Sequence, residues 1–202
     1  MSEQAHPRQP RSPARTACRR ALVLAALLAS PTAARAETTV PLDLQVDLLW
    51  KVVRFERGLL DRAGPKVTLM LVLRPGNATS SRSGAQLEKA LERVKEIGGK
   101  PVRIVLHPYT SIPALKAAVA AEGAQLVYLT PGFDTDVPVM AGALAGVPVI
   151  TIATDGDQVE RGVILGFELV SAKPRISLNV GQAKRQGLDF NSDLFRLVKV
   201  VK

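Results

Sequence analysis

The sequence predicts a single three-layer α/β domain, in which a mainly parallel sheet ends in an antiparallel C-terminal hairpin. Short apolar runs alternate with segments whose apolar residues recur at the helical period, which is typical of β-α-β units with right-handed crossovers. The run at 67–73 is apolar almost throughout, as expected of a strand covered on both faces. The runs at 162–170 and 174–180 are separated only by Ser171-Ala172-Lys173, a connection so short that it predicts a hairpin.

A largely buried helix is predicted first, over residues 42–61. Its leucines and valines mix the 3.6-residue period with a denser apolar stretch, and Gly64-Pro65 ends it. The strand at 67–73 follows, and residues 74–77 then form a turn.

A second helix is predicted to begin at Ser83. Ser83 and Gln86 form a capping-box pair, and the apolar face of the helix continues through Ile97 to Gly98-Gly99. The segment before it, residues 77–82, reads as a loop rich in hydroxyl groups that ends at the helix N-terminus. Because backbone amides at such a terminus attract anions, Arg82 and Ser83 are candidate ligand-binding residues; a polar loop that binds nothing is the alternative.

The remaining elements continue the alternation as far as the hairpin. In order, they are strand 102–106, helix 111–121, strand 126–129, helix 137–145 and strand 149–152. After the hairpin, a helical stretch at 181–186 leads to Gly187. Asn191 or Ser192 is then predicted to cap a last helix, which has Leu194, Leu197, Val198 and Val201 on one face.

Residues 1–36 have the features of a secretory signal peptide. Five arginines between Arg8 and Arg20 precede a short apolar core at 21–29, and Ala34-Arg35-Ala36 has the small-x-small form that signal peptidase accepts. This apolar core is too short to cross a bilayer, which takes about 20 residues. We therefore expect cleavage after Ala36, export to the periplasm and a mature domain at 37–202.

Most of the positive charge lies in this leader. The whole chain holds 27 Lys and Arg against 18 Asp and Glu; without the six bases and one acid of residues 1–36, 21 bases face 17 acids. The remaining bases are scattered, and the chain has only five Phe, two Tyr and one Trp. No nucleic-acid partner is therefore expected.

The mature chain would hold no cysteine and only one histidine, His107. The single cysteine, Cys18, precedes the apolar core of the leader, whereas a lipoprotein cysteine would follow it. Without a mature cysteine there is no disulfide, thiol nucleophile or iron–sulfur site, and a structural zinc site is not expected. We predict no cofactor.

No catalytic motif is visible, since the sequence lacks a G-x-S-x-G elbow, a Walker phosphate loop and a G-x-G-x-x-G turn. We therefore predict that the protein is not an enzyme. His107 and Tyr109 follow one predicted strand and Thr130 follows another, at the edge where open α/β sheets place ligands. These three are candidate ligand-binding residues; for His107 the alternative is a capped or solvated turn residue.

Two acidic pairs also follow predicted strands and are placed to face one cleft. Asp134 with Asp136, and Asp155 with Asp157, offer oxygen ligands of the kind that calcium or magnesium takes. The alternatives are a helix cap for the first pair and an ordinary turn for the second. Because neither pair forms a full loop of spaced oxygens, no metal site is predicted, and Asp134 and Asp155 remain candidate ligand-binding residues.

Residues 162–198 carry the most specific pattern in the chain. A hydrophobic strand is followed by Arg175-Ile176-Ser177-Leu178-Asn179 and then by a segment that begins at Gly187-Leu188. This order resembles the closing segment of the YfiR/HmsC-like family, a hydrophobic strand, R-I-x-L-N and G-L-x-x-S-x-L-L-x-L. The matching positions are Asn179, Gly187, Leu188, Ser192, Leu194 and Leu197. Residues 48–55 are similar to the family's opening helix.

The resemblance implies a non-enzymatic periplasmic regulator that binds the periplasmic part of an inner-membrane signalling protein. The family's best-known member represses a diguanylate cyclase, which controls cyclic-di-GMP and biofilm, and an outer-membrane lipoprotein relieves that repression. Members often dimerise, so a homodimer is a further expectation, whereas redox control by disulfides does not carry over. Among the matched residues, Gly187 is expected to adopt a conformation that other residues resist, and Leu194 and Leu197 to fill core.

A second interpretation is a periplasmic small-molecule sensor or transport-associated substrate-binding protein that uses the cleft at the strand ends. An exported hydrolase is a third, which the absence of a nucleophile-base pair disfavours.

Overall fold

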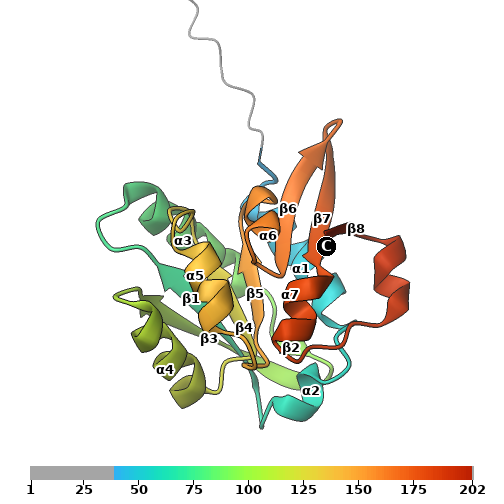
Figure 1. Ribbon diagram of the computed structural model, residues 1–202, viewed down its shortest axis with the longest axis horizontal. Helices are drawn as coiled ribbons and strands as arrows, with labels where there is room; N and C mark the ends of the chain where they lie inside the picture. The colour runs from blue at the N-terminus through green and yellow to red at the C-terminus, as the bar shows by residue number, and fades with distance from the viewer. Residues whose placement is uncertain (1–38, 202) are drawn as a thin grey trace, which may run out of the picture. The chain divides into compact units, whose positions relative to one another are not determined.

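The computed structural model describes residues 39–201, and an eight-stranded sheet runs through them (Figure 1). The strand order is β2-β3-β1-β4-β5-β6-β7-β8. The predicted α/β class is confirmed, since β3, β1, β4, β5 and β6 are parallel and β6 and β7 form an antiparallel hairpin. The strands are β1 (Val67–Leu73), β2 (Glu96–Ile97), β3 (Lys100–Pro108), β4 (Leu126–Leu129), β5 (Ile150–Ala153), β6 (Leu165–Val170), β7 (Lys173–Asn179) and β8 (Lys199–Val201).

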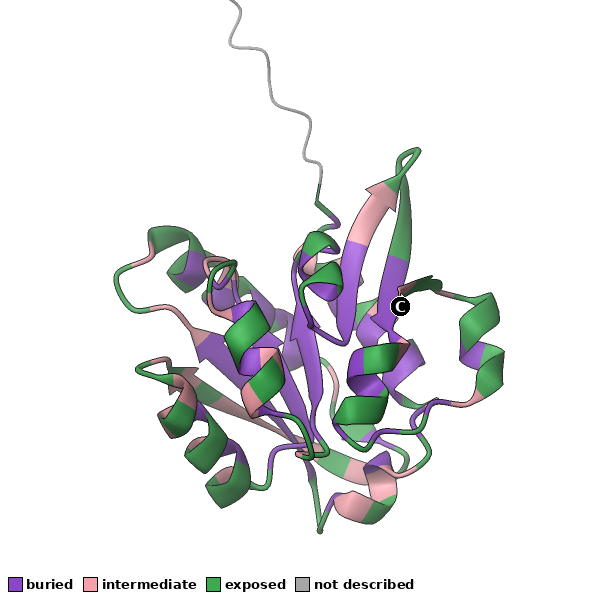
Figure 2. Cartoon of the chain, viewed as in Figure 1, coloured by how far each residue is buried: buried purple, intermediate pink, exposed green. Residues whose placement is uncertain are grey.

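Helices cover both faces of the sheet, which gives the predicted three layers. Leu69 and Leu71 of β1 pack into one apolar cluster with α1 and α3, whereas Met70 and Val72 pack into a second cluster with α4 and α5. Figure 2 shows the buried central strands between helices whose outer surfaces are exposed. The helices are α1 (Leu42–Val53), α2 (Leu59–Arg62), α3 (Ala78–Leu91), α4 (Ile112–Glu122), α5 (Val137–Ala143), α6 (Asp157–Glu160), α7 (Val180–Arg185) and the 3₁₀ helix η1 (Ser192–Arg196).

The strand order sets where a ligand site belongs. Strand β1 lies between β3 on one side and β4 on the other. The connections on the two sides of β1 therefore run over opposite faces of the sheet, and their ends leave a crevice outside the carboxyl ends of the strands.

The hairpin is tighter than the sequence predicts. Lys173 pairs with Val170, so only Ser171 and Ala172 form the turn. Both have positive φ, 51° and 60°, which is the backbone of a two-residue turn that matches the twist of the strands.

The single helix predicted over 42–61 is wrong; the structure has α1 and α2 in its place. Between them Glu56 is buried, and its carboxylate accepts hydrogen bonds from Arg62 at 2.7 Å and from the Asp189 amide at 3.3 Å. The Asn191 amide donates to the Phe55 carbonyl at 2.8 Å. The break is therefore made by contacts with the distant C-terminal segment, which helical periodicity does not reveal.

The predicted loop before Ser83 is also wrong, because α3 begins at Ala78. Asn77 caps this helix by accepting from the Ser80 amide at 2.9 Å. Ser80 is buried and bonded to Thr130, so its hydroxyl serves packing inside the domain. The helix ends at Leu91, and Ile97 belongs to β2, which pairs with the start of β3.

The predicted last helix is replaced by η1 and a short strand. Asn191, rather than Ser192, caps η1 by accepting from the Asp193 amide at 3.1 Å. Strand β8 then pairs in parallel with β7, which leaves Leu197 64% exposed while Leu194 is buried. Leu197 therefore does not fill core, whereas the prediction for Gly187 is confirmed by its φ of +74°.

Within residues 39–201, no helix combines the length and apolar character that crossing a membrane requires. The expected signal peptide, residues 1–36, lies outside the described residues.

Candidate functional site

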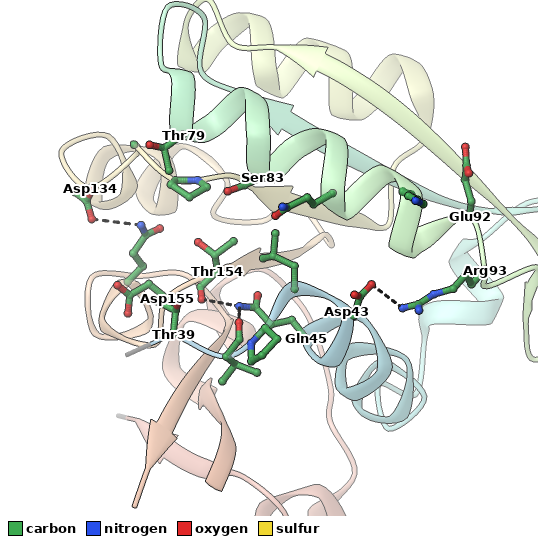
Figure 3. Close-up of a pocket in the computed structure, with 18 of the residues that line it drawn as sticks. Thr39, Asp43, Gln45, Thr79, Ser83, Glu92, Arg93, Asp134, Thr154 and Asp155 are labelled. Carbon is green, nitrogen blue, oxygen red and sulfur yellow. Dashed lines mark hydrogen bonds and ion pairs between the residues drawn. The ribbon is translucent and has the colours of Figure 1, made fainter. Parts of the chain in front are cut away.

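A cleft of about 1300 Å³ opens beyond the carboxyl ends of β4 and β5 (Figure 3). One wall is α3, and the segment at 39–41 with the start of α1 forms the opposite wall. The loops that follow β4 and β5 close one end, where they contribute Asp134, Thr154 and Asp155. This is the edge of the sheet at which open α/β domains place their ligands.

Three of the seven predicted site residues line this cleft: Ser83, Asp134 and Asp155. Asp134 and Asp155 lie at the same end of it, as their positions after neighbouring strands predict (Figure 3). Asp155 also accepts from the Asp157 amide at 3.0 Å, the turn geometry that was the alternative for this pair. Ser83 reaches the cleft from inside α3 rather than from a loop.

Arg82 and His107 do not line the cleft. Arg82 is exposed on α3, where its guanidinium reaches the Ala78 carbonyl at 3.4 Å. His107 lies within β3, beside Val72 of β1, and its Nε2 is buried without a hydrogen-bond partner among the described residues.

Tyr109 belongs to a separate cluster that fastens the ends of β1, β3 and β4 together. Its hydroxyl donates to Asp136 at 3.3 Å, and Arg74 pairs with the same carboxylate at 2.6 Å. The Tyr109 and Phe133 rings meet edge to face at 5.1 Å, with the Arg74 guanidinium over both. Burial, reinforced by the Asp136 charge, raises the pKa of Tyr109 above its ordinary value. Asp136 is engaged in this cluster, and unlike Asp134 it does not line the cleft.

Thr130 is fully buried and serves the fold. Its hydroxyl donates to the Val72 carbonyl at 2.8 Å and lies 2.6 Å from the Ser80 hydroxyl, which in turn accepts from the Arg74 amide. The crevice between β1 and β4 is thus filled by protein side chains, and the open space lies further along the sheet edge.

Gln45, which the sequence pattern did not single out, is a fully buried residue that joins the cleft wall to the sheet. Its amide nitrogen donates to the Val40 carbonyl at 2.7 Å and to the Thr154 carbonyl at 3.1 Å, while its oxygen accepts from the Tyr128 hydroxyl. Burial raises the pKa of Tyr128 far above its ordinary value. The sequence does carry a sign of this burial, because Gln45 stands four residues before Leu49 and therefore on the apolar face of α1.

Gln158 was missed as well. It lines the cleft and is 4% exposed, and its amide nitrogen donates to Asp134 at 3.3 Å. Its amide oxygen is buried and has no hydrogen-bond partner in the described part of the chain. A lone glutamine after an acidic turn gives no sequence signal of this kind.

The far end of the cleft carries charges of both signs. Asp43 pairs with Arg93 at 3.0 Å, and both side chains are largely exposed, so the pair adds little stability. Lys89, Glu92 and Lys95 complete this end. Residues 39–201 contain no group of three or more His, Cys, Asp or Glu side chains suited to a metal ion.

Comparison with known families identifies the chain. The model of the YfiR/HmsC-like family matches residues 46–199. The chain belongs to this family. The match extends the resemblance from the closing motif to nearly all of the described residues.

Solved structures share the fold of this YfiR/HmsC-like chain at low identity. A conserved domain protein from Vibrio cholerae aligns with TM-score 0.56 and 13% identity, covering 80% of this chain and 60% of its own. A ligand-free, open substrate-binding protein with adhesive properties from Clostridium difficile gives 0.52 and 15%, covering 72% and 57%. An ABC domain from Streptococcus pneumonia, in complex with L-Trp, gives 0.56 and 11%, covering 80% and 62%.

The YfiR/HmsC-like chain thus spans about 60% of the length of these structures, and at these identities the likeness concerns the fold alone. No curated protein matches the sequence.

Proposed function

We propose that the protein is an exported regulator that binds the periplasmic part of an inner-membrane signalling protein and represses a diguanylate cyclase. The family match over residues 46–199 is the observation that carries this proposal. Catalysis has no place in it, because the family is regulatory. By the same resemblance, an outer-membrane lipoprotein would sequester the regulator and relieve repression.

Export depends on the leader at residues 1–36. Signal peptidase would cleave after Ala36, and the mature domain would then begin at Glu37, just before the first described residues. N-terminal sequencing of periplasmic protein should therefore find Glu37. Folded protein that retains Met1 in the cytoplasm would contradict export.

The surface proposed for the partner is the exposed apolar group on η1, on β8 and between them, at the edge of the sheet. Phe195, Leu197 and Val200 lie within six residues of one another and are 40%, 64% and 42% exposed. Apolar side chains that gather on a surface commonly mark an interface. Because β8 is the outermost strand, its free edge also suits pairing with a second copy of the chain, the expected homodimer.

The test compares two substitutions of equal exposure. Leu197→Asp adds a charge to the proposed surface, whereas Val139→Asp adds one to α5, where Val139 is 63% exposed. Deletion of the gene should raise cyclic-di-GMP, and only Val139→Asp should restore repression and capture of the membrane partner. Unchanged cyclic-di-GMP on deletion contradicts cyclase repression. Equal behaviour of the two variants contradicts the proposed surface.

A second candidate function is small-molecule sensing through the cleft. At about 1300 Å³ the cleft has room for a small molecule, since common ligand pockets measure roughly 300–1,000 Å³. Of the structures with the same fold, one is described as a substrate-binding protein and another is in complex with L-Trp. Native mass spectrometry of purified protein tests this function, since a sensor should bind a small molecule in the cleft. Neighbouring transporter genes would favour a transport-associated role.

A further inference from the structure

At one end of the cleft, three acceptor oxygens receive no hydrogen bond from the described residues: one on buried Gln158, and one on each of the exposed Asp134 and Asp155. Gln158 donates its amide nitrogen to Oδ1 of Asp134, and Asp155 uses Oδ1 to accept from the Asp157 amide. Among the described residues, none donates to Oδ2 of either aspartate or to Oε1 of Gln158. Asp134, Asp155 and Gln158 all line the cleft, and Figure 3 shows the two aspartates at the same end of it.

Gln158 is the decisive residue of the three, because it is 4% exposed and its oxygen is buried without a partner. Buried polar atoms in folded proteins are nearly always hydrogen-bonded, since leaving one unpaired costs free energy. Turning the amide over does not help, because it would place the Gln158 oxygen against the Asp134 carboxylate. The orphan is therefore an acceptor, and a ligand that satisfies it must bring a donor.

We propose that this end of the cleft binds a primary ammonium group of a small organic ligand. An ammonium carries three N–H donors and no acceptor, which matches three acceptor oxygens, and two of these belong to carboxylates that attract its positive charge. The proposal rests on the sensor function above and names the class of ligand.

A metal ion fits this end less well. Calcium takes 6–8 oxygen ligands, and the described residues offer no cluster of three acidic, histidine or cysteine side chains to begin such a shell. The opposite end of the cleft has Lys89, Arg93 and Lys95 beside Asp43 and Glu92, and because its bases outnumber its acids it suits an ammonium less well. The two ends thus favour one orientation of a ligand with an ammonium at one extremity.

The test is calorimetric titration of the purified protein with primary amines: alkylamines, diamines and the common amino acids. At least one should bind, and for n-butylamine the matched probes are n-butanol, which lacks the charge, and butyltrimethylammonium, which keeps the charge without N–H donors. Neither matched probe should compete for the site. Equal binding of the quaternary ion would overturn the hydrogen-bonding account.

Variants locate the site. Asp134→Asn and Gln158→Met should each weaken amine binding by about ten-fold or more, since each removes a bond to a charged donor. Glu92→Gln removes a carboxylate at the far end of the same cleft and should change binding by less than about two-fold (Figure 3). Gln158→Met should leave the unfolding midpoint of the free protein unchanged or raised, because it deletes an unsatisfied buried acceptor, and water can replace the lost bond to the exposed Asp134. A lowered midpoint with unchanged amine affinity would make Gln158 structural and overturn the proposal.

The outcomes distinguish failure of the ammonium site from failure of the sensor function. If anionic or neutral metabolites bind in the cleft and every amine fails, the ammonium site is overturned and the sensor function stands. Calcium binding that Asp134→Asn abolishes, without amine binding, overturns it in favour of a metal. If no small molecule binds, both the ammonium site and the sensor function fall, while repression of a membrane partner is unaffected.

Discussion

Replacing Tyr128 by phenylalanine should destabilise the domain at neutral pH and much less at high pH. Tyr128 is fully buried on β4, and its hydroxyl donates to Gln45, the residue that also holds the Val40 and Thr154 carbonyls. The substitution leaves the Gln45 oxygen buried without a donor, at a cost of about 2 kcal/mol in the free energy of unfolding.

At alkaline pH, the loss of the Tyr128 phenol favours the variant over the wild type. Burial raises the pKa of Tyr128 in the folded state, so the phenol keeps its proton there, whereas the unfolded chain loses it above a pH of about 10. Above that pH the folded state binds more protons, and the stability of the wild type falls with increasing pH by linkage. At pH 11 this loss is about 1.4 kcal/mol, and phenylalanine at 128 does not suffer it. The gap between the two proteins should therefore shrink from about 2 to roughly 0.6 kcal/mol.

Urea unfolding at pH 8 and pH 11 measures this gap, because groups common to both proteins cancel in the difference. Absorbance of tyrosinate provides the control in a Tyr109→Phe background, where Tyr128 is the only tyrosine left. Its tyrosinate signal should appear only with unfolding. A gap that stays constant from pH 8 to pH 11, or a tyrosinate signal in the folded protein, would refute the reasoning.

Further predictions concern the stability of the domain and test its ion pairs, its glycines and its hairpin turn. Glu56→Gln should cost about 3 kcal/mol in the free energy of unfolding, because it breaks a buried ion pair; Arg57→Gln, in an exposed pair, should cost less than about 0.5 kcal/mol. Gly187→Ala should cost about 1 kcal/mol at its φ of +74°, whereas Gly142→Ala, which meets open space in α5, should stabilise by up to about 1 kcal/mol. Replacing Ser171-Ala172 by Asn-Gly should raise the free energy of unfolding by about 1 kcal/mol, because both positions have positive φ, which Asn and Gly adopt more readily than Ser and Ala. Urea midpoints check all three, and a reversed sign in any of them contradicts its backbone or charge argument.

Local pattern predicted the central strands well, because each is short, apolar and covered on both faces. Strand β1 has the bounds predicted from its apolar run, and the β6–β7 hairpin followed from a short connection. The errors lie where non-local contacts decide. The first helix breaks where the Asp189 amide bonds to Glu56 and the Asn191 amide to Phe55. The last helix becomes η1 and β8 because β7 offers a free edge.

The candidate site was predicted in part for the same reason. Position after a strand correctly placed Asp134 and Asp155 in one cleft, since the carboxyl ends of parallel strands meet at one edge. The same rule failed to place Tyr109 and Thr130 there, because both are engaged in packing between strands. Gln158 owes its significance to an unpaired oxygen, which depends on the surroundings of its side chain.

The bond between Glu56 and the Asp189 amide joins residues 133 positions apart, which bears on the order of events during synthesis. At about 5–20 residues per second, roughly 7–27 s separate the appearance of the two partners from the ribosome. Throughout that interval the α1–α2 corner lacks the contacts that shape it, and its apolar face has no C-terminal cover. A nascent chain of this design therefore completes its native contacts only when its last residues have been made.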